Sequence, residues 1–473
     1  MIKKRQVDDH LGVAIDDYGS GNANTYSLLR IKPQIIKLDR LLINDIDRNT
    51  KKQYFVNSII TFAKENNMEV LAEGVETEAE LRMVIRLKVD YIQGYYTAKP
   101  SMDLMADIDG EVKKVIVSEN IRSDAENKRK IYTASSPAEL SLVQLALEEY
   151  NGITVTTSGL SILGNTDYVA DMCIKVMEGV TCEIDLHDVR LNAVDDLPCI
   201  DIGEGADVTL RINGNCTIDQ KGIHVPEGAK VKIVGSGNLT LDTKGHDCYG
   251  IGCGHNESMG SICLMLSGKM TVRVDGEESI AIGGGTYHSG EGIYICGGGY
   301  DINVASVDGI GIGCFYGDVP LDFRMCYIMM ELRVNEGTGI GSRQGKQSVH
   351  MEHFTVLVKG SGSKLSGVGT NYPSGGKLTF AEGTFEANMN GQDVILMGTL
   401  AGQTQVVMKS CKAKLHGEGN EVLAMGALDG NGTVSLVEVS TNITINSAKP
   451  VAFGTPEGVF ESVGPYPTIY INE

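Results

Sequence analysis

Residues 279–285 read Ser-Ile-Ala-Ile-Gly-Gly-Gly, and the Ile282-Gly283 pair inside this stretch recurs through the second part of the chain. An apolar residue followed by glycine returns every 28 to 31 residues. The pairs are Ile251-Gly252, Ile282-Gly283, Ile312-Gly313, Ile340-Gly341, Val368-Gly369, Met397-Gly398, Met425-Gly426 and Phe453-Gly454, with weaker counterparts at Ile174, Ile200 and Ile223. A unit this short cannot bury its own apolar face, so neighbouring units must stack to form a core. The repeat therefore predicts a solenoid of about eleven coils.

Each unit contains short runs in which apolar and polar residues alternate, such as residues 270–274 and 354–358. Glycine, asparagine, aspartate and serine separate these runs, which is typical of strands joined by turns. The repeat length suits a right-handed parallel β-helix with three strands per coil, whereas WD40 blades are longer and carry tryptophan, which this chain lacks. We expect the apolar member of each pair to point into the lumen and the glycine to form a tight corner.

A helical pattern precedes the first coil. Ser136-Pro137-Ala138-Glu139 combines an N-cap residue, a proline at the first helical position and a capping-box glutamate. We expect an amphipathic helix from there to about Tyr150 that caps the open end of the solenoid.

The repeat units resemble those of bacterial β-helical surface and carbohydrate-associated proteins. This resemblance implies a glycan or a protein as ligand of the β-helix. It identifies no catalytic residues, because no cluster of aspartate with arginine or lysine on one exterior face can be selected from the sequence.

Composition divides the chain near residue 130. Only six of the 58 glycines precede that point, and acidic and basic residues balance there at 21 each, so the net charge of −20 belongs to the second part. An acidic surface repels nucleic acid and anionic lipid, which excludes a nucleic acid polymer as partner. All 11 cysteines also lie in the second part, and no apolar run approaches membrane-spanning length. These features predict reduced thiols, no membrane segment and a cytoplasmic protein.

One cysteine-containing group has ligand-like spacing. It comprises His246, Cys248, Cys253 and His255. A metal site is one interpretation, but the repeat explains this segment without it.

The first part contains four short β-type runs, each of which ends in polar residues and precedes a helical pattern. The polar residues are Asp16 and Asp17, then Lys37, Glu73 and Gln93, separated by steps of 21, 36 and 20 residues from Asp16 onward. Such steps suit successive β/α units of a TIM-like barrel, in which the carboxyl ends of the strands share one face. Adjacent carboxylates repel each other unless a cation lies between them, and carboxylate oxygens favour Mg²⁺ or Mn²⁺.

Four motifs in this part resemble the EAL domain family of cyclic di-GMP phosphodiesterases. They are Asp16-Asp17-Tyr18-Gly19-Ser20-Gly21, Lys37-Leu38-Asp39-Arg40, Glu73-Gly74-Val75-Glu76 and Gln93-Gly94-Tyr95, followed by Ala98-Lys99-Pro100. Their order and spacing match the family over about 85 residues, which makes the resemblance specific although each motif alone is weak.

The resemblance implies hydrolysis of one phosphodiester bond of cyclic di-GMP, giving pGpG, with two divalent cations. It implies that Asp16 bridges both metals and that Asp17 and Glu73 bind the second one. Lys37 resembles the lysine that holds the attacking water. Gln93 resembles its hydrogen-bonding partner, and Glu76 resembles a supporting carboxylate. Each of these residues also has a purely structural interpretation as a cap, an ion pair or a partner of the backbone.

The sequence departs from the family in one respect. Family members carry the Glu-Ala-Leu motif and further metal ligands before the Asp-Asp strand, but only 15 residues precede Asp16 here. We therefore expect the last four β/α units of a TIM-like barrel at residues 1–110, a linker at 111–134, and at 135–473 an all-β right-handed parallel β-helix with its N-terminal capping helix.

Two functions follow from this organisation. The first is a cyclic di-GMP signalling protein whose phosphodiesterase domain is truncated and inactive in this chain. The alternative is a non-enzymatic β-helix scaffold or carbohydrate-binding protein that carries an EAL remnant. The sequence leaves open whether the protein is an oligomer and whether a second chain completes the barrel.

Overall fold

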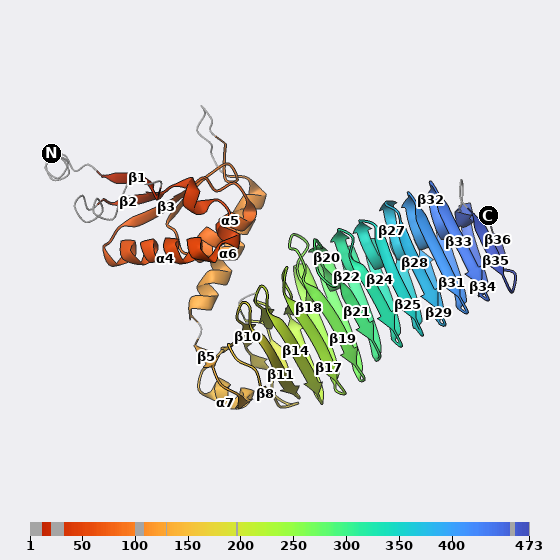
Figure 1. Ribbon diagram of the computed structural model, residues 1–473, viewed down its shortest axis with the longest axis horizontal. Coiled ribbons are helices and arrows are strands. Elements are labelled where there is room, and N and C mark those ends of the chain that lie inside the picture. The colour runs from red at the N-terminus through yellow and green to blue at the C-terminus, as the bar shows by residue number, and fades with distance from the viewer. Residues whose placement is uncertain are drawn as a thin grey trace. The chain divides into compact units, whose positions relative to one another are not determined.

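The computed structural model describes residues 12–19, 33–99, 108–128, 130–194, 197–454 and 459–472. The chain divides into two compact units, Met1–Lys128 and Arg129–Glu473 (Figure 1). Ser20, Gly21 and Pro100 of the family motifs lie outside the described residues.

The first unit is a four-stranded parallel sheet with helices packed on it. The strands run in the order β1 (Ala14–Tyr18), β2 (Ile35–Leu38), β3 (Glu69–Glu73) and β4 (Tyr91–Gln93). The helices are α3 (Arg40–Ile43), the short 3₁₀ helix η1 (Ile46–Arg48), α4 (Thr50–Glu65), α5 (Glu78–Arg86) and α6 (Gly110–Lys128). This is the alternating order expected of successive β/α units. The closed barrel to which such units would belong stays a prediction.

The core of this unit lies between the sheet and its helices. Alternate strand residues such as Ile36 and Val70 are fully buried against apolar residues of α4 and α5, including Ile60 and Leu81. Helix α5 begins with a capping box, in which the Thr77 side chain and the Glu80 side chain each accept a backbone N–H. The local sequence thus specifies both the start of the helix and its buried face.

The boundary between the two units differs from the expected one. Helix α6 occupies most of the segment assigned to a linker, and it belongs to the first unit. The remaining linker residues hold the first strand of the solenoid, β5 (Ile131–Ala134), which pairs with β7 (Gly152–Val155). The connection between the two units is therefore much shorter than 111–134.

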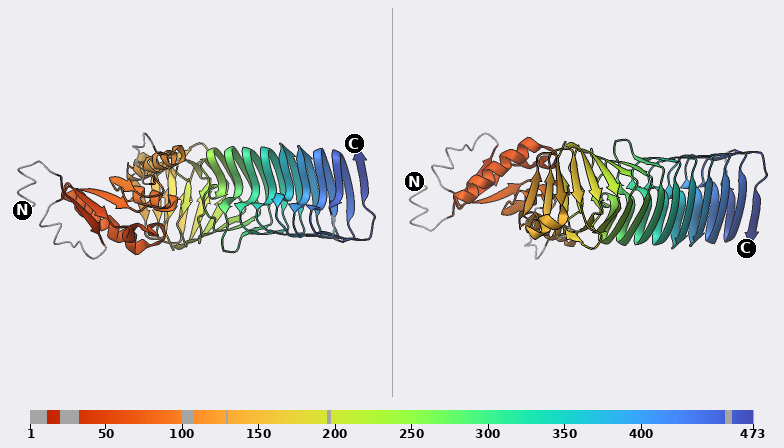
Figure 2. Two further views of the ribbon diagram at one scale, coloured as in Figure 1. Left: turned by 90° about the horizontal axis from the view of Figure 1, so that it is seen from above. Right: turned by 90° about the horizontal axis from the view of Figure 1, so that it is seen from below.

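The second unit is a β-solenoid whose strands pair in parallel from coil to coil (Figure 2). One sheet contains β6 (Ala138–Ser141), β8 (Leu160–Leu163), β11 (Thr181–His187), β14 (Asp207–Asn213), β17 (Lys230–Gly235), β19 (Ser261–Leu266), β21 (Ile293–Cys296), β23 (Pro320–Arg324), β25 (Gln347–Glu352), β28 (Gly376–Ala381), β31 (Thr404–Lys409), β33 (Gly432–Val437) and β35 (Phe460–Val463).

The other sheet of the solenoid wraps around the two remaining faces. It contains β5, β7, β9 (Ala170–Asp171), β10 (Cys173–Val176), β12 (Arg190–Asn192), β13 (Ile200–Ile202), β15 (Asn215–Gln220), β16 (Ile223–His224), β18 (Asn238–Gly252), β20 (Lys269–Thr286), β22 (Gly299–Tyr316), β24 (Tyr327–Gln344), β26 (Thr355–Ser361), β27 (Lys364–Pro373), β29 (Thr384–Asn390), β30 (Asp393–Ala401), β32 (Lys412–Asp429), β34 (Ser440–Gly454) and β36 (Thr468–Asn472). In the coil of β26, β27 and β28 the three strands are separate. In several other coils the first two run on as one long strand.

The predicted column of apolar residues is confirmed. Each member pairs with its counterpart in the next coil, from Ile174 through Ile312 to Phe453. The members from Ile174 to Met425 are fully buried, and Phe453 is partly buried in the last coils. The right-handed winding stays a prediction.

The glycines that follow the seven column residues from Ile251 to Met425 form a corner that other residues cannot adopt. Gly313 has φ of 143°, and a Cβ atom added to it would lie 1.8 Å from the carbonyl oxygen of Gly341 in the next coil. Six more glycines of this column have positive φ: Gly252, Gly283, Gly341, Gly369, Gly398 and Gly426. The coils can stack closely at this corner because no side chain separates their backbones.

The start of the solenoid corrects the expected capping helix. Pro137 precedes a strand, β6, that pairs with β8 in the next coil, so the Ser136 pattern does not begin a helix. The helix is the shorter α7 (Leu142–Leu147), whose N-cap is Ser141, and its residues Leu142 and Leu145 are buried in the solenoid core. No helix in the described ranges is long and apolar enough to cross a membrane.

Candidate metal centre

The strands of the first unit carry polar side chains at or near their carboxyl ends. Asp16 and Asp17 lie on β1, Lys37 on β2, Glu73 on β3 and Gln93 on β4. The four strands are parallel, so these ends meet at one edge of the sheet. The structure therefore brings the expected residues to one edge, whereas their catalytic roles stay predictions.

A β-bulge explains how two adjacent aspartates serve the same site. Successive residues of a regular strand point to opposite faces. Between Ile15 and Tyr18, β1 contains one residue more than β2 opposite, and Asp17 has a left-handed φ of 52°. The extra residue changes the direction of the side chains that follow it, so both aspartates can face the same site. Oxygen atoms of both aspartates come within 4.8 Å of a Glu73 carboxylate oxygen.

Lys37 lies between two of these carboxylates. Its Nζ atom donates to Asp16 Oδ1 at 2.6 Å and lies 2.5 Å from Glu73 Oε1. The hydrogen bond to Asp16, and then that to Glu73, raises the pKa of Lys37, and the Lys37 ammonium lowers the pKa of Asp16. Lys37 therefore stays protonated at neutral pH, and it can orient an oxygen ligand as a donor but cannot accept a proton.

The three carboxylates fit a divalent cation. Among the described residues, Asp16, Asp17 and Glu73 are the one group of three or more potential ligands whose ligand atoms lie this close together. An all-oxygen, anionic donor set is the kind that Mg²⁺ and Mn²⁺ prefer. Lys37 neutralises one of the three charges, which leaves a net negative site for a cation.

Glu76 does not join this cluster directly. Its carboxylate accepts from Arg40 Nη2 at 2.9 Å. The turn that carries Glu76 passes close to Arg40, because a Cβ atom on Gly74 would lie 2.6 Å from Arg40 Cγ and Gly74 has a positive φ of 73°. Arg40 ends the Lys37-Leu38-Asp39-Arg40 motif, but the motif does not indicate its pairing with Glu76.

Gln93 stands at the exposed end of β4. It is in register with Glu73 on β3, and its carbonyl accepts the N–H of Val75 at 3.2 Å. The following Gly94 cannot be replaced without strain, because its Cβ atom would lie 2.0 Å from the Val75 carbonyl oxygen. The Gln-Gly pair therefore holds the β4 end close to the β3 turn.

The match to a family model covers this site. The model is that of the EAL domain, and it matches residues 5–100. We call this matched span the EAL region. The matched span includes every residue of the candidate metal centre.

Relatives of the EAL region are named for cyclic di-GMP chemistry. The probable cyclic di-GMP phosphodiesterase PdeA of Escherichia coli K12 is 41% identical over 88 residues, which are 19% of this chain and 12% of PdeA. The bifunctional diguanylate cyclase/cyclic di-GMP phosphodiesterase MucR of Pseudomonas aeruginosa is 32% identical over 90 residues, which are 19% of this chain and 13% of MucR. The chain thus spans about an eighth of the length of these curated relatives.

A solved structure is also similar in sequence to the EAL region. It is a manganese and cyclic di-GMP complex of Klebsiella pneumoniae BlrP1, 31% identical, with coverage of 21% of this chain and 25% of that chain and a TM-score of 0.20.

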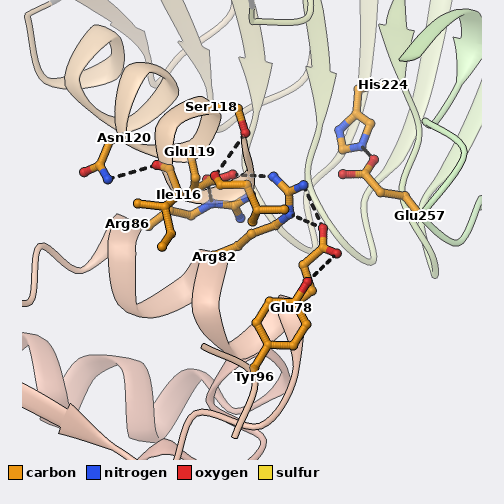
Figure 3. A network of polar contacts seen from close by, with 11 residues as sticks. Glu78, Arg82, Arg86, Tyr96, Ile116, Ser118, Glu119, Asn120, His224 and Glu257 are labelled. Carbon is orange, nitrogen blue, oxygen red and sulfur yellow. Dashed lines mark hydrogen bonds and ion pairs between the residues drawn. The ribbon is translucent and has the colours of Figure 1, made fainter. Parts of the chain in front are cut away.

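Buried ion pairs anchor helix α6 to the helix of the EAL region beside it. Glu119 on α6 is 1% exposed and accepts from Arg82 at 2.9 Å and from Arg86 at 2.5 Å (Figure 3). Arg82 also pairs with Glu78, which accepts the Tyr96 hydroxyl at 3.0 Å. Burial and this hydrogen bond raise the pKa of Tyr96 to about 12. The network fixes the segment after β4 against α5.

The solenoid has a buried polar cluster of its own. His224 on β16 contacts Asp201 Oδ1 through Nδ1 at 2.7 Å. It also contacts Glu257 Oε2 through Nε2 at 3.1 Å (Figure 3). Burial alone would lower the pKa of His224, but the two carboxylates raise it to about 9. The protonated imidazolium therefore joins the strand of Asp201 to the turn that carries Glu257.

The ligand-like group of histidines and cysteines in the solenoid is dispersed. The exposed His246 pairs with Glu277, whereas Cys248 is buried beside Ser279. The His255 ring lies against Phe315, with ring centroids 4.3 Å apart. Each of these side chains thus has a contact partner within the solenoid, as the repeat interpretation expects.

Proposed function

We propose that the protein is a cyclic di-GMP signalling protein whose EAL region supplies the last four β/α units, and half of the site, of a phosphodiesterase barrel. The observation that carries this proposal is the convergence of Asp16, Asp17 and Glu73 within 4.8 Å around the Lys37 ammonium. The EAL match and the names of the relatives support cyclic di-GMP as the ligand.

The carboxylate cluster would hold Mg²⁺ or Mn²⁺. Asp16, Asp17 and Glu73 would be its ligands, and Asp16 is also the aspartate that contacts Lys37. A bound divalent cation would supply electrostatic stabilisation of negative charge on the phosphoryl oxygens. The EAL family is metal-dependent, and the donor set of this chain fits that requirement.

Lys37 would position the attacking water by donating a hydrogen bond to it. Its ammonium is held in place by Asp16 and Glu73, so its remaining donor direction is fixed by two contacts. Gln93, in register with Glu73, would be the second group that contacts this water. Glu76 would act through Arg40, whose position it fixes.

The chain alone should hydrolyse cyclic di-GMP negligibly, because four strands supply only part of a barrel site. The measurement is pGpG formation by chromatography with Mn²⁺ or Mg²⁺ present. Turnover comparable to that of an intact EAL domain would contradict the proposal that these four strands supply only half of a site.

A hybrid tests whether the residues of this half are catalytic. The amino-terminal half of a related EAL domain, joined in frame before Asp16, should complete the barrel and restore pGpG formation. Lys37→Ala should then remove most of the activity, about a hundredfold or more, and Asp16→Asn should weaken both turnover and Mn²⁺ binding. Lys64→Ala on the exposed face of α4 is the control. A folded, Mn²⁺-binding hybrid whose activity ignores the first two substitutions would refute the assigned roles.

A further inference from the structure

The outer surface of the solenoid has a cavity over β22. This strand lies between β20 and β24 of the neighbouring coils (Figure 1). In two columns of outward-facing residues, β22 carries a shorter side chain than the coil on either side. In the order β20, β22 and β24, the columns are Arg273, Asn303 and Glu331, and Asp275, Ala305 and Arg333. The step in side-chain length leaves a cavity of about 220 Å³, which these six residues line.

Two charged groups in this cavity have no partner. The Arg273 guanidinium and the Asp275 carboxylate lie two residues apart on the exposed face of β20, and neither group has a hydrogen bond or ion pair with another described residue. Arg333, by contrast, is held by Glu331, with its Nη2 atom 2.8 Å from Oε1. The cavity therefore offers a free donor and a free acceptor beside a fixed ion pair.

The charges around the cavity cancel. Three cationic and three anionic side chains line it, namely Lys244, Arg273 and Arg333, and Asp242, Asp275 and Glu331. A cavity without net charge selects neither an anion nor a cation, and the net charge of −20 on the chain repels anionic polymers. A hydroxyl group can both donate and accept a hydrogen bond, so a neutral, hydroxyl-rich molecule suits a cavity with mixed donors and acceptors.

An exposed aromatic side chain continues this surface along β24. Tyr327 is 45% exposed and faces outward four residues before Glu331, which places it about 13 Å away along the strand. Met329, which is 42% exposed, lies between them. Tyr327 is in register with Gly299 of β22, where an added Cβ atom would meet nothing within 4 Å, so the surface beside Tyr327 is open. An apolar aromatic face next to polar groups suits a sugar ring, which has apolar faces and a polar rim.

We propose that the outward face of β22 from Gly299 to Ala305, with the flanking side chains of β20 and β24, is a binding site for a neutral oligosaccharide. We call it the β22 site. The cavity is smaller than the roughly 300 to 1,000 Å³ of sites for drug-sized ligands, so it holds one sugar ring. The hydroxyls of that ring accept from Arg273 and donate to Asp275, and the linked rings extend along β22 to Tyr327.

Affinity electrophoresis of the full chain tests the proposal. Separate gels contain the neutral polymers galactomannan, xyloglucan, arabinoxylan and dextran, and a further gel contains the acidic polymer polygalacturonate. At least one neutral polymer should slow the protein, whereas polygalacturonate should not. EDTA should leave the retardation unchanged, because the β22 site is separate from the metal centre. A protein that no neutral polymer retards, or that polygalacturonate alone retards, would overturn the proposal.

Filling the cavity tests its place in the site. Ala305→Gln adds a long neutral side chain to the floor and should raise the dissociation constant of the retarding polymer at least about tenfold. Ser361→Gln is the matched control, because Ser361 is exposed in the same column but lies two coils away, outside the cavity. It should bind like the wild type.

Removal of the free guanidinium tests the polar contact. Arg273→Gln should weaken binding about tenfold, because a hydrogen bond from a charged donor is lost. Lys359→Gln removes one positive charge from the same column two coils away and should have no effect. Thermal melts show that each variant is folded. Folded Ala305→Gln and Arg273→Gln proteins that both bind like the wild type would refute the β22 site.

Tyr327→Ala tests the extension of the site along the strand. The probes are oligosaccharides of two and six residues prepared from the retarding polymer, and calorimetry measures their affinities. The substitution should weaken binding of the hexasaccharide about five- to tenfold and leave that of the disaccharide unchanged. A variant that matches the wild type for both probes would overturn the extended site.

Discussion

Lys37 is the residue on which the electrostatics of the metal centre depend. It contributes one positive charge among three carboxylates, and it contacts Asp16 and Glu73 directly. A divalent cation must therefore bind beside an existing ammonium. Removal of the ammonium should strengthen cation binding, because the cluster becomes more negative. It should also abolish the hydrogen bond that positions the attacking water, so the two roles of Lys37 can be measured separately.

We expect Lys37→Met to increase the affinity for Mn²⁺ about three- to tenfold, because the cluster becomes more negative. The same change should raise the pKa of Asp16 toward its ordinary value, since the Lys37 hydrogen bond is the largest cause of its lowering. Mn²⁺ affinity is measured by calorimetry and the pKa by carboxyl-carbon NMR. Lys64→Met on α4 is the matched control, and equal affinities in both variants would show that Lys37 is not part of the cation site.

His224 makes the stability of the solenoid depend on pH. Its pKa in the folded protein, about 9, lies above the ordinary value of 6.5. The stabilisation by the charged imidazolium is therefore complete below about pH 6.5 and is lost as the pH rises through 9. Urea unfolding should show a loss on the order of 2 to 3 kcal/mol across this window.

His224→Gln should lack this alkaline loss while being less stable at pH 6.5. His246→Gln, at an exposed histidine that also pairs with a glutamate, should keep the wild-type dependence. A wild-type slope in His224→Gln would mean that other groups cause the alkaline destabilisation.

The gathering of Asp16, Lys37 and Glu73 could be predicted, because the ends of successive parallel strands meet at one edge. The pairing of Glu76 with Arg40 could not be predicted, because it depends on the left-handed turn at Gly74 that brings the two side chains together. The two carboxylates around His224 could not be predicted either, since Glu257 lies 33 residues away on a turn whose path no repeat specifies.

At the scale of the element, the apolar column is the feature that holds the coils in register. Ile312 on β22 is fully buried and pairs with Ile282 and Ile340 in the coils on either side. Ile312→Asp would bury a charge with no partner, which should lower the free energy of unfolding by more than about 4 kcal/mol. Thermal denaturation followed by circular dichroism measures the effect.

Val307→Asp is the control on the same strand, because Val307 is 53% exposed at the bend of β22. It should melt within a few degrees of the wild type. If Ile312→Asp melts like this control, the column residue must face solvent and the register must be wrong.

The register of the solenoid was predictable because every coil repeats one pattern, so that a single assignment determines the whole column. The start of the capping helix could not be predicted in the same way. Ser136-Pro137-Ala138-Glu139 satisfies the rules for a helix start, but the pairing of β6 with β8 adds a strand to an existing sheet. Long-range pairing outweighed the local preference there, and the helix begins only at Leu142.

At the scale of the whole molecule, the two units have separate cores. In the described parts of the chain, no residue belongs to both the core of the first unit and that of the solenoid. We expect calorimetry of the full chain to show two transitions, of which the solenoid transition persists, within a few degrees, in a protein of residues 130–473. A single transition that is lost in the shorter protein would show that the units fold as one.

The glycine corner also bears on how such a chain can change its length over evolution. Unequal recombination that duplicates or deletes one complete repeat leaves every remaining corner against another corner, because neighbouring glycine backbones are interchangeable. An insertion of a single codon within a paired strand instead shifts a side chain into that corner, whereas one in a turn is accommodated, as the repeat lengths of 28 to 31 residues show. Natural variants of this gene should therefore differ by whole repeats or by single residues confined to the turns, and selection can adjust the length of the solenoid one coil at a time.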